Sequence, residues 1–328
     1  MKPSVRSRSV LIATAVTTSL VLSGCGNDSG GAGSSGEVTL GFVNGGDTSF
    51  HTCLLKAVEQ TATAEDAKVY TANSHQNAGT ELSNIEDMIS RGVSALIVQT
   101  VNVDSLKGDI AKAKASGIPI YLTSVSTSDV DDILGAAVVD LKKVGALDAG
   151  WVAKDAGGKD VKVGIVAGAP GAASDLLVGG FQAALPANAK VVANQPGMFN
   201  PAKAQDIAEN MIEAQPDLAY AFVANEEMAF SVRKAFDAAG KKNVKIVTVN
   251  GTDEGVAAVK SGEFSATVAN SAKTIGDTAV KNTVGLLAEK AGKAASVKGN
   301  EKVDKIADIP LVLVTKENLS DAPQYCPK

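Results

Sequence analysis

The sequence predicts an α/β fold made of two doubly wound parallel-sheet lobes. Short apolar segments alternate with segments of helical periodicity along most of the 328 residues, and this rhythm is typical of parallel sheets covered by helices on both faces. The alternation of strands and helices starts again near Gly135. It yields about ten strands, which are more than one sheet of this type usually contains. The chain is also long enough for two ordinary domains.

The first half of the chain supplies the elements of one lobe. Leu82, Ile85 and Ile89 recur at helical spacing, and Gly117 ends the last helix of this half. The expected elements are a strand at 38–43, a helix from about 49 to 64, a weak strand at 68–70, a helix around 82–89, a strand at 95–98, a helix around 106–113 and a strand at 118–122.

The second half repeats the pattern. Val144, Leu147 and Trp151 mark one helix, and Leu177 and Phe181 mark another. The expected strands lie at 135–139, 161–166, 191–192, 218–223, 244–249 and 265–269, with further helices at 201–214 and 226–239.

The N-terminal segment is predicted to be an export signal over residues 1–24. A basic start is followed by an apolar run over residues 10–22, which is too short to span a bilayer comfortably, and then by small residues before Cys25. This ending resembles a bacterial lipobox, in which the cysteine is diacylated, so we expect Cys25 to carry a lipid anchor. An ordinary secretory signal with a chance cysteine is the alternative.

Residues 25–36 are predicted to form a flexible linker, because 26–36 contain no apolar residue larger than alanine. Folding is expected to begin near Glu37. The expected location is therefore extracytoplasmic, with a lipid anchor in the cell membrane.

Composition and charge narrow the classes of partner. Without the predicted signal, 28 Lys plus Arg residues face 36 Asp plus Glu residues, a formal net charge of −8. An acidic chain without a basic cluster disfavours nucleic acid as a partner. Aromatic residues make up only 4% of the chain, so stacking surfaces are scarce.

Sequence motifs give no indication of catalysis or of a metal. The chain contains no G-x-S-x-G, H-E-x-x-H or Walker motif. His51 and His75 have no Cys or His partner at ligand spacing. We therefore expect neither an enzyme nor a cofactor nor a metal site.

Six short segments stand out by their order and spacing. They are GFVN at 41–44, SF at 49–50, SRGVSALIV at 90–98, GIPI at 117–120, FVANEEMA at 222–229 and VNGT at 249–252. Together they resemble the motifs of ribose-type periplasmic binding proteins, and the resemblance runs from about Val38 to Val314.

This resemblance implies the type I periplasmic-binding-protein fold, in which two Rossmann-like lobes are joined by a three-segment hinge. The ligand would sit between the lobes at the carboxyl ends of the strands, and the lobes would close around it. The implied lobes are residues 37–139 plus 271–308 and residues 140–270 plus 309–328, with crossings near 139–140, 270–271 and 308–310.

The resemblance also implies the partners. The closed form would be recognised by the permease of an ABC transporter in the membrane, and we expect the protein to be a monomer. A lipid anchor suits this role, since it keeps the binding protein beside its transporter.

Carrying the family pattern onto this sequence gives the candidate ligand-binding residues. Most follow an apolar strand, and Asn and Gln offer both a donor and an acceptor to a polyhydroxylated ligand. Phe50 and Phe199 could sandwich a ring face. The candidates are Asn44, Phe50, His51, Gln99, Ser124, Phe199, Asn225, Asn250 and Asn270.

Each candidate has a structural alternative. The asparagines could form turns or cap helices, the two phenylalanines could belong to the core, and His51 could lie on the surface. Glu226 and Glu227 are expected to occupy the first turn of a helix, where carboxylates suit the dipole.

Three departures from the family pattern bear on the ligand. Ser124 and Val125 stand where ribose-type proteins carry an Asp-Arg pair, Leu177 stands in place of an arginine, and Asn250 in place of an aspartate. Since charged hydrogen bonds are about twice as strong as neutral ones, the site is not built for ribose in the usual way. We expect a sugar, a sugar alcohol or a similar uncharged polar molecule.

Cys53 and Cys326 both lie in the exported part of the chain. An even pair outside the cytoplasm favours a disulfide, which would pin the C-terminal tail across the hinge. Two free buried thiols are the alternative.

The leading hypothesis is therefore the solute-binding lipoprotein of an ABC importer. A ligand sensor that presents its closed form to a membrane receptor is the alternative, which a neighbouring permease gene would exclude. A transcriptional regulator is excluded by the export signal, and an extracytoplasmic enzyme would require a chemically altered ligand.

Overall fold

The structure is a computed structural model that describes residues 37–127, 129–292 and 303–328. The predicted signal over residues 1–24, the lipidated Cys25 and the linker over 25–36 lie outside the described residues. Residues Glu37–Lys328 form one compact unit. No helix of the described ranges is long and apolar enough to cross a membrane.

The first lobe is built on a six-stranded sheet whose strand pairs are all parallel. Across the sheet its strands are β11 (Ile306–Asp308), β5 (Gly135–Val138), β4 (Ile120–Ser124), β3 (Ala95–Val98), β1 (Thr39–Asn44) and β2 (Lys68–Asn73).

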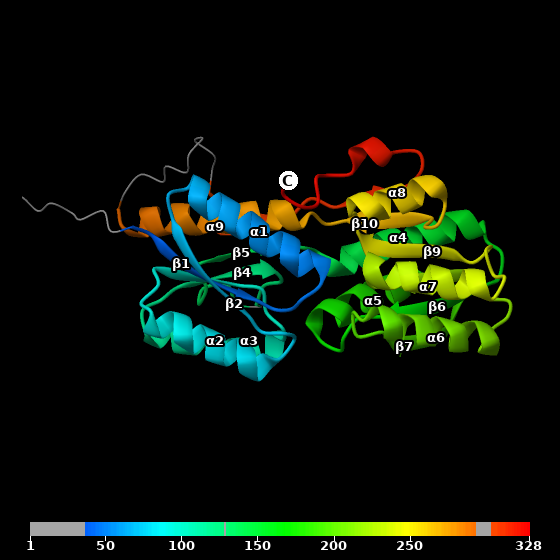
Figure 1. Cartoon of the computed structure of the whole chain (residues 1–328), viewed down its shortest axis with the longest axis horizontal. Coiled ribbons are helices and arrows are strands. Elements are labelled where there is room, and N and C mark those ends of the chain that lie inside the picture. Colours follow the sequence, from blue (N-terminus) through cyan, green and yellow to red (C-terminus); the bar gives the residue numbers. More distant parts are fainter. Residues whose placement is uncertain (1–36, 128, 293–302) are drawn as a thin grey trace, which may run out of the picture. The chain divides into compact units, whose positions relative to one another are not determined.

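Helices cover both faces of this first sheet (Figure 1). One face is covered by α1 (Ser49–Ala64) and α9 (Ala272–Lys290), and the other by α2 (Ala78–Ser90) and α3 (Val103–Ala115). Along β3, Ala95 and Ile97 join one buried cluster while Leu96 and Val98 join the other. Burial on both faces explains why β3 reads as a continuous apolar run.

The second lobe repeats this architecture. Its sheet is parallel except for the antiparallel pair β10–β12. Across the sheet its strands are β12 (Val312–Val314), β10 (Ala266–Ala269), β9 (Lys245–Asn250), β8 (Tyr220–Val223), β6 (Val161–Ala167) and β7 (Ala189–Pro196).

The helices of the second lobe also form two layers. The pair α4 (Leu141–Ala156) and α5 (Ala172–Ala184) covers one face. The pair α6 (Pro201–Ala214) and α7 (Glu226–Ala238) covers the other, together with α8 (Asp253–Ser261). A single-turn 3-10 helix, Leu319–Asp321, follows β12. The predicted fold class, two α/β lobes with parallel sheets, is confirmed.

Sheet membership changes three times along the chain: between β5 and β6, between β10 and β11, and between β11 and β12. The residue boundaries of the two lobes given above stay a prediction.

Five described elements were not expected from the sequence: the helices α8 and α9, the strands β11 and β12, and the 3-10 helix Leu319–Asp321. Both strands have three residues, and α8 has nine, so each carries too little periodic signal. The buried side of α9 contains small residues, among them Gly276, where a Cβ would lie 2.6 Å from Ala57 Cβ. Close approach of α1 and α9 therefore selects small residues and weakens the apolar stripe.

Each sheet has one point where the strand order reverses. In the first lobe this point lies between β1 and β3, and in the second between β6 and β8. Loops at such a point diverge to opposite faces of the sheet and leave a crevice at the carboxyl ends of the strands. The fold thus predicts a site in that crevice.

Candidate functional site

A cavity of about 320 Å³ lies where the carboxyl ends of strands from both sheets meet. Residues at or just after the carboxyl ends of β1, β2, β3 and β4 line it from the first lobe, and residues at or just after the ends of β6, β7, β8, β9 and β10 line it from the second. Eight of the nine predicted residues line this cavity: Phe50, His51, Gln99, Ser124, Phe199, Asn225, Asn250 and Asn270. Their contact with a ligand stays a prediction.

Asn44 is the predicted residue that does not line the cavity. It ends β1 and is buried, and its Nδ2 donates to the backbone carbonyl of His51 at 2.9 Å. This bond closes the turn from β1 into α1, so Asn44 holds the backbone that carries Phe50 and His51.

Gln99 is fixed by the loop that follows β1. Its Oε1 accepts from the backbone N–H of Gly45 at 3.0 Å. A Cβ at position 45 would lie 2.1 Å from that same oxygen, so only glycine permits this contact. The turn at Gly45 and the side-chain amide of Gln99 therefore hold each other in place.

His51 is a neutral part of the site. Burial lowers its pKa to about 4, while a hydrogen bond to Gln99 and the charge of Asp47 oppose the shift. Its Nδ1 lies 2.8 Å from Thr48 Oγ1. At neutral pH the imidazole is therefore uncharged, with its ring engaged by Thr48 and Gln99.

Phe50 and Phe199 reach the cavity from different lobes. Phe199 follows β7 in a left-handed backbone conformation with φ of 51°. A Cβ at position 168 would lie 2.1 Å from the Phe199 ring, so Gly168 makes room for the aromatic side chain. Each lobe thus supplies one aromatic residue to the lining, as a pair that sandwiches a ligand requires.

The asparagines at the ends of β8 and β9 have one side of each amide already engaged. Asn225 caps α7, since its Oδ1 accepts from Met228 N at 3.0 Å, which leaves Nδ2 for a ligand. Asn250 donates Nδ2 to the hydroxyl of Tyr325 at 3.2 Å, which leaves Oδ1. Asn225 can therefore cap α7 with its Oδ1 and still present its Nδ2 to the cavity.

Two polar atoms at the cavity are buried without a partner within the described part of the chain. They are Ser124 Oγ and Asn270 Oδ1. A buried polar atom without a partner destabilises a protein by roughly 1–3 kcal/mol, and such atoms in native proteins call for an explanation. A bound polar molecule would supply their partners.

The described lining contains no Asp, Glu, Lys or Arg side chain. Ser124, Leu177 and Asn250, which depart from the ribose-type pattern, all line the cavity. Val125 is buried but lies outside the lining. The site is therefore uncharged and partly apolar.

Sequence reasoning missed several lining residues. All of them lie between the end of a strand and the first turn of the helix that follows it, so strand ends were the available signal. These polar or apolar additions are Thr48, Ser49, Gln76, Thr100, Leu141, Ser174 and Met198. Gln76, Leu141 and Ser174 follow β2, β5 and β6, after which no residue was predicted.

Glu226 differs from its expected role. It does lie in the first turn of α7, but its carboxylate is buried and accepts from Gly251 N, Thr252 N, Thr252 Oγ1 and Thr267 Oγ1. Burial raises its pKa, and the hydrogen bonds oppose that rise. Glu226 thus ties the loop after β9 to the start of α7 and to β10.

Glu81 plays the same part in the first lobe. Its buried carboxylate accepts from Thr100 Oγ1 at 2.8 Å and from Val101 N at 2.6 Å. Burial raises its pKa to about 7, and both hydrogen bonds oppose the rise. Thr100 and Val101 line the cavity, so Glu81 supports this wall from behind.

The geometry suits reversible capture of a small molecule. The cavity brings amides, hydroxyls and two aromatic rings together between two lobes. No group of three His, Cys, Asp or Glu residues in the described ranges is placed to hold a metal ion. This arrangement defines the class of a two-lobed binding protein.

The chain belongs to the periplasmic binding protein family, whose domain, described as "Periplasmic binding protein domain", matches residues 40–292. The resemblance predicted from the sequence is confirmed. Family membership makes the chain a binding protein and not an enzyme, and it places the protein outside the cytoplasm.

Similar proteins are known from several bacteria. The chain is 27% identical to the ribose import binding protein of Bacillus subtilis (strain 168) over 288 residues, which are 87% of this chain and 90% of that protein. It is 28% identical to the xylitol-binding protein of Mycolicibacterium smegmatis over 327 residues, which are 98% of this chain and 89% of that protein.

A solved structure shows the same fold. The ABC transporter solute binding protein from Bacillus halodurans with bound myo-inositol superposes with a TM-score of 0.79 at 24% identity. The match covers 88% of this chain and 98% of that chain.

Proposed function

We propose that this protein is the solute-binding lipoprotein of an ABC importer and that it captures a neutral sugar or sugar alcohol other than ribose. The observation that carries the proposal is the absence of any Asp, Glu, Lys or Arg side chain from the described lining, combined with its many amides and hydroxyls. An uncharged polyhydroxylated molecule matches both features.

Hydroxyl groups of such a ligand would satisfy the buried polar atoms of the site. Ser124 Oγ and Asn270 Oδ1 have no partner within the described residues, and a ligand hydroxyl can donate to either. Phe50 and Phe199 offer apolar faces to the C–H groups of the same molecule. A ligand carboxylate would find no cationic side chain.

The relatives support this class of ligand. Two of the similar proteins are named for the binding of ribose and of xylitol. Solved structures of the same fold contain bound myo-inositol or D-allose. The neutral residues at positions 124, 177 and 250 favour a ligand other than ribose.

Capture would proceed by closure of the two lobes about their connecting segments, and the closed form would bind the permease. The predicted lipid on Cys25 would keep the monomeric protein beside that permease, and the predicted linker over residues 25–36 would join the lipid to the two lobes.

A thermal-shift screen tests the ligand class. The panel contains sugars, polyols, amino acids and inorganic anions. A ligand at about 100 times its dissociation constant should add roughly 2.7 kcal/mol to the free energy of unfolding. Shifts with amino acids or anions, and none with a neutral polyol, would contradict the proposal.

Asn270→Ala tests the site itself. Because Asn270 Oδ1 is buried without a partner among the described residues, its removal should leave the melting temperature of the ligand-free protein unchanged or raise it. The thermal shift produced by the best polyol of the panel should nevertheless disappear. A retained shift would place the ligand elsewhere.

A further inference from the structure

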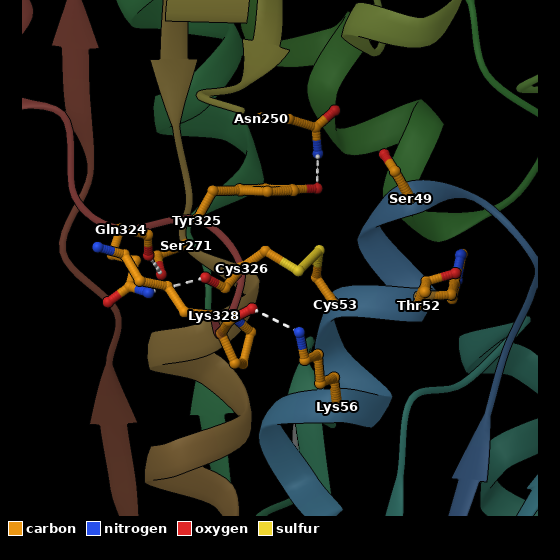
Figure 2. Close-up of a disulfide and its surroundings, with 12 residues drawn as sticks. Ser49, Thr52, Cys53, Lys56, Asn250, Ser271, Gln324, Tyr325, Cys326 and Lys328 are labelled. Atoms are coloured by element: carbon orange, nitrogen blue, oxygen red, sulfur yellow. Dashed lines mark hydrogen bonds between the residues drawn. A yellow bond between two sulfur atoms is a disulfide. The ribbon is translucent and has the colours of Figure 1, made fainter. Parts of the chain in front are cut away.

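The C-terminal segment Gln324–Lys328 lies against elements of both lobes behind the cavity. It follows β12 of the second lobe, and Cys326 is joined to Cys53 of α1 by a disulfide, with 4.9 Å between the two Cα atoms (Figure 2). The two cysteines are 273 residues apart in the sequence. The disulfide thus holds the end of the chain on the first lobe.

Hydrogen bonds hold the same segment at its other positions. Ser271 Oγ donates to the carbonyl of Gln324 at 2.6 Å, and Lys273 N at the start of α9 donates to the carbonyl of Tyr325 at 2.9 Å. On the side of α1, Lys56 Nζ donates to the carbonyl of Pro327 at 2.9 Å. The backbone of Tyr325 is therefore fixed from both sides.

The side chain of Tyr325 points toward the site. It is only 3% exposed, and its hydroxyl accepts from Asn250 Nδ2 at 3.2 Å (Figure 2). Burial and then the charge of Glu226 raise the pKa of Tyr325, while a hydrogen bond to Ser49 opposes the rise. The phenol therefore keeps its proton at neutral pH. Tyr325 is not part of the cavity lining, whereas Asn250 and Ser49 are.

This contact decides how Asn250 can bind. A free asparagine amide presents either its donor or its acceptor by rotating about its last bond. Here Nδ2 is held by Tyr325, and Figure 2 shows Oδ1 on the side away from the phenol. Asn250 also has a φ of 139°, a backbone conformation that non-glycine residues rarely adopt. A partner for its side chain helps to maintain this conformation.

We propose that Tyr325, held behind the cavity by the Cys53–Cys326 disulfide, is a positioning residue that fixes Asn250 as a hydrogen-bond acceptor for a ligand hydroxyl. This inference rests on the proposed function, since it assumes that the cavity binds a polyol. It gives the C-terminal segment Gln324–Lys328 and the Cys53–Cys326 disulfide an indirect part in ligand binding.

Tyr325→Phe is the central variant, because it removes the hydroxyl and keeps the buried ring. Tyr121→Phe is its matched control: the Tyr121 hydroxyl also accepts from a buried asparagine, Asn282, at 3.1 Å, but outside the cavity lining. Both variants lose the same kind of hydrogen bond, so their stabilities should fall by similar amounts.

Nuclear magnetic resonance of protein labelled with ¹⁵N-asparagine reads the position of the amide without any ligand. The side-chain signal of Asn250 is identified by its absence from Asn250→Ala. Tyr325→Phe should shift this signal and leave that of Asn270 in place, while Tyr121→Phe should leave both. An unshifted Asn250 signal in Tyr325→Phe would overturn the proposal.

Titration calorimetry with xylitol and with myo-inositol as probes reads the effect on binding. Tyr325→Phe should raise the dissociation constant of a bound probe about fivefold, and it should have no further effect in the Asn250→Ala background. Equal effects in both backgrounds would show that Tyr325 does not act through Asn250. Failure of the unaltered protein to bind either polyol would count against the proposed ligand class, and the resonance experiment would still decide the role of Tyr325.

The disulfide is tested by mass and by replacement. Protein alkylated without reductant should gain no mass at Cys53 or Cys326, and two alkylated thiols would rule the bridge out. In the paired variant Cys53→Ser and Cys326→Ser, the Asn250 signal should move toward its position in Tyr325→Phe. An unmoved signal would overturn the role of the bridge in holding Tyr325.

Discussion

At the residue scale, the lining of the cavity is neutral, but buried carboxyl groups stand directly behind it. Glu81 supports Thr100 and Val101 in the first lobe, and Glu226 supports Gly251 and Thr252 in the second. A carboxylate accepts two backbone or hydroxyl donors at once, so it can fix a loop that follows a strand. In the first lobe the cavity is therefore lined by Thr100 and Val101 and not by the carboxyl group of Glu81.

Glu81→Gln should change how stability depends on pH. The folded-state pKa of Glu81 is raised by burial from 4.5 to about 7, so its contribution to stability is present below pH 4.5 and is lost as the pH rises toward 7. Glutamine mimics the protonated acid. Relative to the unaltered protein, the variant should therefore gain stability between these pH values, by on the order of 3 kcal/mol.

Urea denaturation of both proteins from pH 4 to pH 8 measures this difference. Subtracting the two profiles removes the contribution of His51, whose lowered pKa acts in the opposite direction over much of the same range. Asp109, whose own pKa is raised by burial, lies close enough to affect Glu81. A difference that does not vary with pH would show that folding leaves the pKa of Glu81 unchanged.

At the element scale, the start of α1 is completed by the other lobe. The N-cap residue Thr48 makes no side-chain capping bond, and the backbone N–H of Ser49 donates instead to Glu227 Oε1 of α7 at 2.7 Å. Helix N-termini leave N–H groups without partners and favour negative charge. Glu227 therefore acts as a cap for α1 that is supplied by the second lobe.

Glu227→Ala should weaken ligand binding by destabilising this arrangement of the lobes. Hydrogen bonds to charged groups contribute roughly 1.5–3 kcal/mol, so the dissociation constant of the best polyol should rise about tenfold or more.

Glu254→Ala is the control for this prediction. Glu254 also lies in the first turn of a helix of the second lobe, α8, and is exposed. Calorimetric titration that finds the same dissociation constant for both variants would contradict a role for Glu227 across the lobes.

At the scale of the whole molecule, the two lobes form a site that neither contains alone. The first contributes Phe50, Gln99 and Ser124, and the second contributes Phe199 and Asn270 to the same cavity. The predicted lipid on Cys25 would hold this body at a membrane, because buried acyl methylenes contribute about 0.8 kcal/mol each.

Cys25→Ala should release the protein from the membrane. In detergent phase separation of cells that express each form, the unaltered protein should enter the detergent phase and the variant the aqueous phase. Mass spectrometry of the mature N-terminal peptide identifies the acyl chains. A mature protein without them would show that residues 1–24 are an ordinary secretory signal.

The local pattern of the chain determined the class of fold, and the resemblance to a known family indicated much of the site. Runs such as 95–98 and 161–166 identified buried strands because apolar periodicity is a property of neighbouring residues. The resemblance to ribose-type binding proteins, carried over residue by residue, predicted that Gln99, Asn225 and Asn270 lie at one site, and all three line the cavity. The residues that bind, and their ligand, remain predictions.

Only the tertiary structure decided which groups meet across the chain. Ser49 meets Glu227 over 178 residues, and no local period records such a pair. Burial likewise separated Glu226 from Glu227, which are adjacent and alike in sequence. The physical reason is that secondary structure depends on neighbours in sequence, whereas caps, bridges and buried charges depend on neighbours in space.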